Sequence, residues 1–300
     1  MSVAWLGRGR RGLPSLAAAT STRWGRSGAI VGGLSGALLG LVLWAPASWV
    51  AHRVADASGT RVLLAQADGT VWNGSAALVL TGGPGSSDAA ALPGRLQWTL
   101  RPAWSGLVLR LRQSCCLSGE LALRLTPGWG GVTLRWQDAP VAVAVSTSVS
   151  TSASTPIGQW PLAVLAGLGT PWNTLQLDGT LRLAGNGAQL QWVQGRATLQ
   201  GALQLELEQV RSRMSSLPAL GSYRLSLRGH DPAQPQLDGN PLLLDTLNGA
   251  LRLTGSGQWT GARLRFRGEA SAAPGQEAAL SNLLNIIGRR QGALSIISIG

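Results

Sequence analysis

The residues that most often carry chemistry are few in this chain and far apart. It has two histidines, His52 and His230, and two cysteines, Cys115 and Cys116. A catalytic serine or cysteine needs a histidine or comparable base, and a zinc site needs several ligands at set spacing. The G-x-S-x-G, P-loop, H-E-x-x-H and EF-hand patterns are also absent from the sequence. We therefore expect no catalytic residue, no metal site and no cofactor.

The two cysteines are neighbours in the sequence. A disulfide between neighbours needs a strained eight-membered ring, with the Cα atoms closer than in an ordinary disulfide. We therefore expect Cys115 and Cys116 to be free, reduced thiols, with an intermolecular disulfide as the alternative.

The charged residues fall on the wet faces of expected strands. Glu206 and Glu208 share one such face, and we expect them to be solvated. Ordinary solvation is also expected of the arginines, and the alternative is contact with anionic headgroups or acidic partner surfaces. Among them, Arg263, Arg265 and Arg267 form the clearest cluster. The other arginines in this group are Arg110, Arg112, Arg124, Arg135, Arg182, Arg224, Arg228 and Arg252.

Composition argues against nucleic-acid binding. The net charge is +12, but five of the 25 basic residues precede residue 27, where no acid occurs. Tryptophan supplies 13 of the 15 aromatic side chains without the clustering that base stacking needs. We expect Trp72, Trp98, Trp136 and Trp192 to fill the core.

Residues 27–50 contain no ionisable side chain. At 1.5 Å per residue this segment is long enough to cross a bilayer, so it is expected to be a transmembrane helix. The arginine-rich residues 1–26 then form a cytoplasmic tail and residues 51–300 a periplasmic domain of an inner-membrane protein. The alternative is a cleaved signal peptide, because Ala45-Pro46-Ala47 faintly resembles a cleavage site.

Downstream, apolar residues alternate with polar ones at a period of two. The pattern predicts an all-β fold of antiparallel meanders and hairpins, either a sandwich or an open half-barrel-like groove. Three similar stretches, 69–80, 179–192 and 249–266, are each expected to be a strand, a glycine-rich turn and a strand. The expected turns are Asp68-Gly69, Asn73-Gly74, Asp178-Gly179, Gly185-Asn186-Gly187, Asp238-Gly239 and Asn248-Gly249.

The Ser/Thr-rich segment 146–161 has the composition of a linker. It suggests two halves, 60–145 and 162–300, and the sequence leaves open whether they form one sheet or two. Helices are expected only at 162–168 and 277–290, the latter with leucines at helical spacing, and a short strand closes the chain.

The sequence resembles the type II secretion system protein N family. The resemblance rests on GTVWNGSA at 69–76, LDGTLRL at 177–183, LNGALRLTG at 247–255 and, most specifically, ALSNLLNIIGRRQGALSIISIG at 279–300. It implies one N-terminal membrane helix and a periplasmic β domain. It also implies an accessory, non-catalytic role in the inner-membrane platform that supports export of folded proteins across the outer membrane.

The implied partners are the other single-span platform proteins and the membrane, with lipid as a further candidate and no nucleic acid. A second hypothesis is a periplasmic carrier of lipid or lipopolysaccharide, in which an open sheet exposes leucine and tryptophan to acyl chains. An open groove and a closed sandwich use the same strand pattern, so the sequence does not separate them.

Overall fold

The computed structural model describes residues 23–137, 154–193, 196–229, 239–261 and 263–300. It divides into two compact units, Met1–Trp44 and Ala45–Gly300. The expected cytoplasmic tail lies mostly outside the described residues, as does much of the expected linker.

The segment 27–50 contains parts of two helices where one was expected. Helix α1 (Arg23–Leu43) ends before Pro46, and helix α2 (Ala47–Ala57) begins after it. Proline disfavours the helical conformation in the residue before it, and Pro46 itself is extended (φ −70°, ψ 149°), so the helix stops here. In the part of the chain that the structure describes, no helix combines the length and the apolar character needed to cross a membrane.

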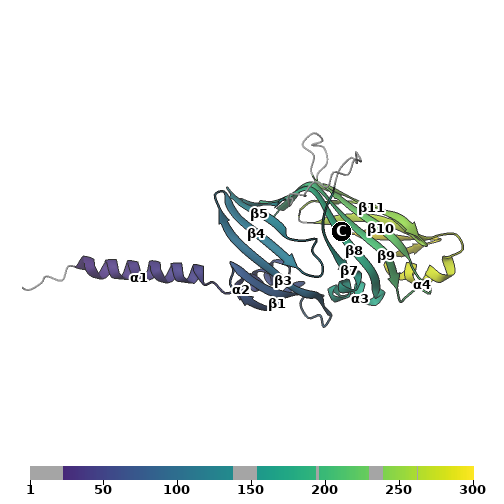
Figure 1. Cartoon of the computed structure of the whole chain (residues 1–300). Helices are drawn as coiled ribbons and strands as arrows, with labels where there is room; N and C mark the ends of the chain where they lie inside the picture. Colours follow the sequence, from purple (N-terminus) through teal and green to yellow (C-terminus); the bar gives the residue numbers. More distant parts are fainter. Residues whose placement is uncertain (1–22, 138–153, 194–195, 230–238, 262) are drawn as a thin grey trace, which may run out of the picture. The chain divides into compact units, whose positions relative to one another are not determined.

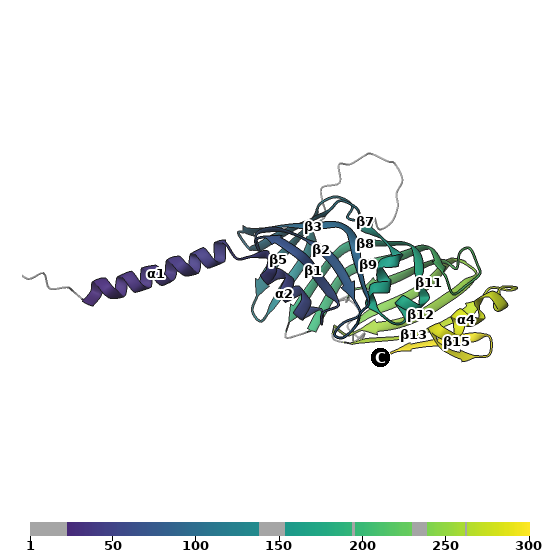
Figure 2. The same ribbon diagram turned by 90° about the horizontal axis from the view of Figure 1, so that it is seen from below.

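The second unit is built around one continuous, curved sheet, which answers the question of one sheet or two (Figures 1 and 2). Neighbouring strands are antiparallel, as expected, and most follow one another in chain order. The first strands, in chain order, are β1 (Val62–Gly69), β2 (Asn73–Thr81), β3 (Ala89–Ala103), β4 (Gly106–Gln113), β5 (Leu121–Gly128), β6 (Gly131–Gln137) and β7 (Thr155–Pro161). The remaining strands are β8 (Leu177–Val193), β9 (Arg196–Ser212), β10 (Gly221–Arg228), β11 (Asn240–Gly249), β12 (Leu251–Trp259), β13 (Leu264–Ala272), β14 (Arg289–Gln291) and β15 (Leu294–Ile299).

Short helices pack against this sheet. The 3-10 helix η1 (Leu162–Leu168) and the helices α3 (Trp172–Leu175) and α4 (Glu277–Ile287) join α2 in the second unit. The expected helix at 162–168 is confirmed as a 3-10 helix. The one expected at 277–290 is confirmed only as far as Ile287, because Arg289 and Arg290 belong to strand β14. Helix α2 was missed because its sequence continues the apolar run before it.

Strand β8 is the junction between the early and late parts of the sheet. Its second half pairs with β6, from Gln189 to Val193, and its first half pairs with β7, from Thr180 to Gly185. Both partners use the same edge, since β9 occupies the other edge along its whole length. Residues 155–161, expected to belong to a linker, therefore form a strand that completes the sheet.

Two expected turns are β-bulges inside β8. The register with β9 shifts between Asp178 and Thr180 and again between Asn186 and Gln189. Gly179 and Gly187 have positive φ values of 131° and 55°. Positive φ suits a bulge as well as a turn, so the glycine signal was correct and its interpretation was wrong. Residues 179–192 consequently form part of one strand and no hairpin.

The stretch 249–266 does form a hairpin, of β12 and β13. Gly261 lies in its turn, but Gly255 and Gly257 lie within β12. A Cβ atom on Gly255 would lie 2.4 Å from Cζ of Phe266, so the glycine makes room for this ring. The turn itself closes with a hydrogen bond from Thr260 N to Arg263 O of 3.0 Å.

Candidate interaction surfaces

One face of the sheet is apolar, and helix α4 closes it over the late strands. Leu280, Leu283 and Leu284 are almost completely buried there. They belong to a core with Tyr223 and other residues of the late strands, and the predicted helical spacing of these leucines is confirmed. The other buried residues of this α4 core are Leu162, Leu175, Val210, Leu220, Leu251 and Ala270.

Tyr223 is one of the buried residues of the α4 core. Its hydroxyl donates a hydrogen bond of 3.0 Å to Leu251 O. Burial raises the pKa of this phenol above its ordinary value. The interior therefore favours the neutral side chain.

Helix α2 closes the same apolar face over the early strands. Its Ala47 is buried together with Ala76 and Trp98. The Trp98 indole donates a hydrogen bond of 3.2 Å to Val71 O, which satisfies its one polar group. This α2 core is smaller than the α4 core.

Between the two closed ends, leucines lie opposite one another on successive strands. Leu107, Leu125, Leu134 and Leu190 form one such row, across β4, β5, β6 and β8. These side chains are half-buried. Of the two architectures expected, the continuous sheet agrees with the open one and not with two separate packed sheets.

The balance of acidic and basic side chains on the polar face differs between the late and the early strands. On β8 to β10, Glu206 pairs with Arg224 and Glu208 with Arg182, each at 2.9 Å. Both carboxylates are partly buried, so the expectation of simply solvated acids was wrong. The chain brings arginines to them from neighbouring strands, which sequence spacing alone does not reveal.

On β4 to β6 the arginines outnumber the acids. Glu120 pairs with Arg110 at 3.4 Å and accepts a 2.7 Å hydrogen bond from Nε of Arg112. Arg124 and Arg135 lie directly opposite each other on β5 and β6, a pairing of like charges that costs stability. This part of the polar face therefore has an excess of positive charge.

The expected arginine cluster lies at the last long strand. Arg263 precedes β13, while Arg265 and Arg267 lie on it, and all three are exposed. Arg265 and Arg267 line a shallow hollow of about 520 Å³ beside Ile299. The cluster is accessible, as is required both for ordinary solvation and for contact with anionic headgroups or acidic partner surfaces.

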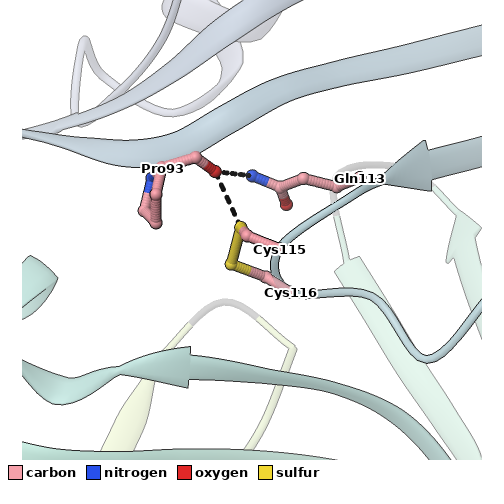
Figure 3. Close-up of a disulfide and its surroundings, with 4 residues drawn as sticks. All are labelled: Pro93, Gln113, Cys115 and Cys116. Atoms are coloured by element: carbon pink, nitrogen blue, oxygen red, sulfur yellow. Dashed lines mark hydrogen bonds between the residues drawn. A yellow bond between two sulfur atoms is a disulfide. The ribbon is translucent and has the colours of Figure 1, made fainter.

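Cys115 and Cys116 form a disulfide, so the expectation of free thiols was wrong (Figure 3). Their Cα atoms are 3.7 Å apart. Pro93 O accepts a 3.1 Å hydrogen bond from Gln113 Nε2 and lies 2.7 Å from Sγ of Cys115. A disulfide sulfur carries no hydrogen, so the second approach is a close contact and not a donated hydrogen bond.

The loop that carries this disulfide joins β4 to β5 and is fixed to β7. Gln159 N donates a hydrogen bond of 2.7 Å to Cys116 O, and Ser118 N donates one of 3.1 Å to Ile157 O. These partners lie about 40 residues away in sequence, so tertiary pairing holds the backbone of the cysteine pair. The loop thereby connects the early strands to the strands that follow.

The structure describes one of the two histidines. His52 lies in α2, and His230 is outside the described residues. Within the ranges that the structure describes, no group of three or more His, Cys, Asp or Glu side chains could hold a metal ion.

The tryptophans are distributed differently from the expectation. Trp98 is buried, as expected, but Trp192 is 54% exposed. Trp104 and Trp129, which sequence reasoning did not single out, are fully exposed in the turns after β3 and β5. The signal that could have found them is their position beside serine and glycine, between two alternating segments.

Comparison with known protein families identifies the family of this chain. The family model described as "Type II secretion system (T2SS), protein N" matches residues 60–296. No curated protein and no solved structure gives a significant match.

The match covers most of the chain, including every strand from β1 to β14 and the first residues of β15. The chain therefore belongs to the type II secretion system protein N family, as its sequence motifs predicted. It is a component of the type II secretion system, and the family does not favour the lipid-carrier hypothesis.

Proposed function

We propose that this chain is a non-catalytic, accessory subunit of the inner-membrane platform of the type II secretion system. The observation that carries the proposal is the family match over residues 60–296. In this proposal the sheet binds other platform subunits and contributes no chemistry.

The membrane part of the proposal rests on the sequence of the first unit. Residues 27–50 carry no ionisable side chain and follow Arg8, Arg10, Arg11, Arg23 and Arg26. An apolar segment with arginines on one flank retains that flank in the cytoplasm. The proposed topology is a single anchor that ends before Ala47, because this residue is buried against the sheet, with the second unit in the periplasm.

The second unit offers surfaces suited to protein partners. Strand β1 is the first strand of the sheet, and only β2 pairs with it among the described strands. An unpaired strand edge can accept an extended segment of a partner through backbone hydrogen bonds. The positively charged face of β4 to β6 would favour an acidic partner surface.

The test is photo-cross-linking in the native cell of the full-length chain with a C-terminal affinity tag. A photoreactive residue is placed at the β1 edge, at Gln66, and in a control variant at Ser281, on α4 and away from this edge. Both proteins and lipids are identified by mass spectrometry after gentle extraction.

Cross-links from position 66 to inner-membrane secretion subunits, stronger than those from position 281, would support the proposal. Recovery of phospholipid or lipopolysaccharide without secretion subunits would contradict it and favour the carrier. Protease accessibility of the tag in spheroplasts tests the topology separately, because only a periplasmic C-terminus is cleaved there.

A further inference from the structure

Exposed indoles gather at one end of the early strands. Trp104 and Trp129 are both 107% exposed relative to a reference tryptophan, and Trp192 is 54% exposed. Burying an indole removes a large apolar area from water, so leaving three in solvent is costly unless something covers them.

The strand register places these three side chains at the same end of the sheet. Ala103 pairs with Gly106 at the β3–β4 turn, and Gly128 pairs with Gly131 at the β5–β6 turn. These turns are two strand spacings apart, about 10 Å. Trp192 is the direct partner of Val132, and both are exposed, so β8 extends the apolar end by a further strand.

The chain enters the second unit at this same end. Val71 N, in the β1–β2 turn, donates a hydrogen bond of 2.9 Å to Ala45 O. That turn lies at the same end of the sheet as the β3–β4 turn, because Asn73 pairs with Thr99, four residues before Ala103. The first residue of the second unit, Ala45, is thus held at this end of the sheet.

Exposed arginines accompany the indoles at this end. Arg101 lies just before the β3–β4 turn and Arg196 begins β9, and both are exposed. At the opposite end, the connections before β3 and β5 carry the acids Asp88 and Glu120. Indoles accompanied by arginines suit the headgroup region of a bilayer, where indoles partition and guanidinium groups meet phosphates.

We infer that Trp104, Trp129 and Trp192, together with Arg101 and Arg196, form a membrane-contact rim that rests on the surface of a phospholipid bilayer. The inference rests on the proposed membrane anchor, which would deliver this end of the sheet to the bilayer. Contact through the rim would set the orientation of the sheet relative to the bilayer. It would thereby determine which strand edges are accessible to a partner.

The test uses the full-length chain, reconstituted in vesicles of phosphatidylethanolamine and phosphatidylglycerol that contain a phospholipid with a diazirine group in the headgroup region. After photolysis, lipid adducts are mapped by mass spectrometry of proteolytic peptides. We expect adducts in the peptides with Trp104 and Trp129, and not in the connections 82–88 and 114–120 at the opposite end.

The variant Trp104→Ser/Trp129→Ser should lose the adducts in both turn peptides. Its matched control is Trp172→Ser, which removes an exposed indole near the start of β8, and its adduct pattern should be unchanged. Circular dichroism of each variant shows whether the sheet is retained. Since carbene insertion does not require an indole, loss of adducts reports loss of contact.

Adducts within residues 27–50 report the anchor independently of the rim. Adducts there but not at the turns would overturn the rim and leave the proposed function standing. Adducts in neither place would overturn the rim together with the proposed anchor. Equal labelling of both ends of the sheet, or retention of the turn adducts in the double variant, would also overturn it.

Discussion

The two helices that close the apolar face, α4 and α2, do so with cores of very different size. The α4 core buries three consecutive helical contacts, Leu280, Leu283 and Leu284, against the late strands. In the α2 core only Ala47, Ala76 and Trp98 are buried. A fully buried leucine contributes about 1.5–3 kcal/mol, so the late strands hold more of the folding free energy. The early strands, with their small core and exposed indoles, are the part suited to external contacts.

Removing residues 279–300 tests this comparison with the largest expected effect. The deletion removes most of α4 together with β14 and β15, which leaves β13 as an unpaired edge and Leu251 and Ala270 uncovered. We expect the cooperative unfolding transition to be lost, as measured by circular dichroism in detergent.

A chain shortened by the equally long segment 1–22 serves as the control and should unfold like the full chain. An unchanged transition after the C-terminal deletion would show that the α4 core does not dominate stability.

A single truncation in α4 sharpens the comparison. Leu283→Ala should lower the free energy of unfolding by about 2–5 kcal/mol, because it opens a cavity in a packed core. Ile286→Ala, on the same helix but 38% exposed, should cost less than about 1 kcal/mol. Denaturant titration of both variants gives the difference, and equal costs would contradict the orientation of α4.

Substitution of Asn240 tests how much a buried side-chain amide stabilises the late strands. Its side chain is buried and donates hydrogen bonds of 3.0 Å to Leu199 O and 3.1 Å to Arg228 O. Asn240→Ala leaves these carbonyls without a donor, so we expect a loss of about 1–3 kcal/mol in denaturant unfolding. The exposed Asn248→Ala is the control, and a loss no larger than that of the control would show that water replaces the amide.

The pH dependence of stability tests the burial of Tyr223, the chain's one tyrosine. Its pKa is raised above 10.0 in the folded state, so the unfolded state loses its proton first as pH rises. The contribution of this group is complete below about pH 10 and falls above it, by at most about 1.4 kcal/mol per pH unit.

We therefore expect stability to decline above pH 10 in the wild type and to decline less in Tyr223→Phe. Unfolding is followed by circular dichroism between pH 8 and 11. Parallel profiles for the two proteins would show that the decline comes from another group.

Reduction of the disulfide is expected to change stability the least. It joins adjacent residues and so restricts the unfolded chain very little, and we expect reduction to cost about 1 kcal/mol or less. Alkylation of the denatured, unreduced protein should label neither cysteine, whereas labelling after reduction should modify both. Labelling before reduction would restore the interpretation as free thiols.

The sequence by itself determined the class of the fold and the family. Apolar residues alternate with polar ones in segments such as Leu107, Leu109 and Leu111. This pattern requires only that one face of the strand be buried, so it can be recognised within a single short segment. The helical spacing of Leu280, Leu283, Leu284 and Ile287 likewise predicted α4 and its buried side. Motifs at 69–76 and 279–300 were specific enough to indicate the family that the family model confirms.

The tertiary structure alone decided where the positive-φ glycines, the cysteines and the acids belong. Gly179 and Gly187 form bulges because β9 pairs with β8 on both sides of each. Cys115 and Cys116 meet as a disulfide in a loop held by β7, and Glu206 and Glu208 are paired by arginines on β10 and β8. Each outcome depends on partners from distant parts of the chain, and the spacing of neighbouring residues carries no information about them.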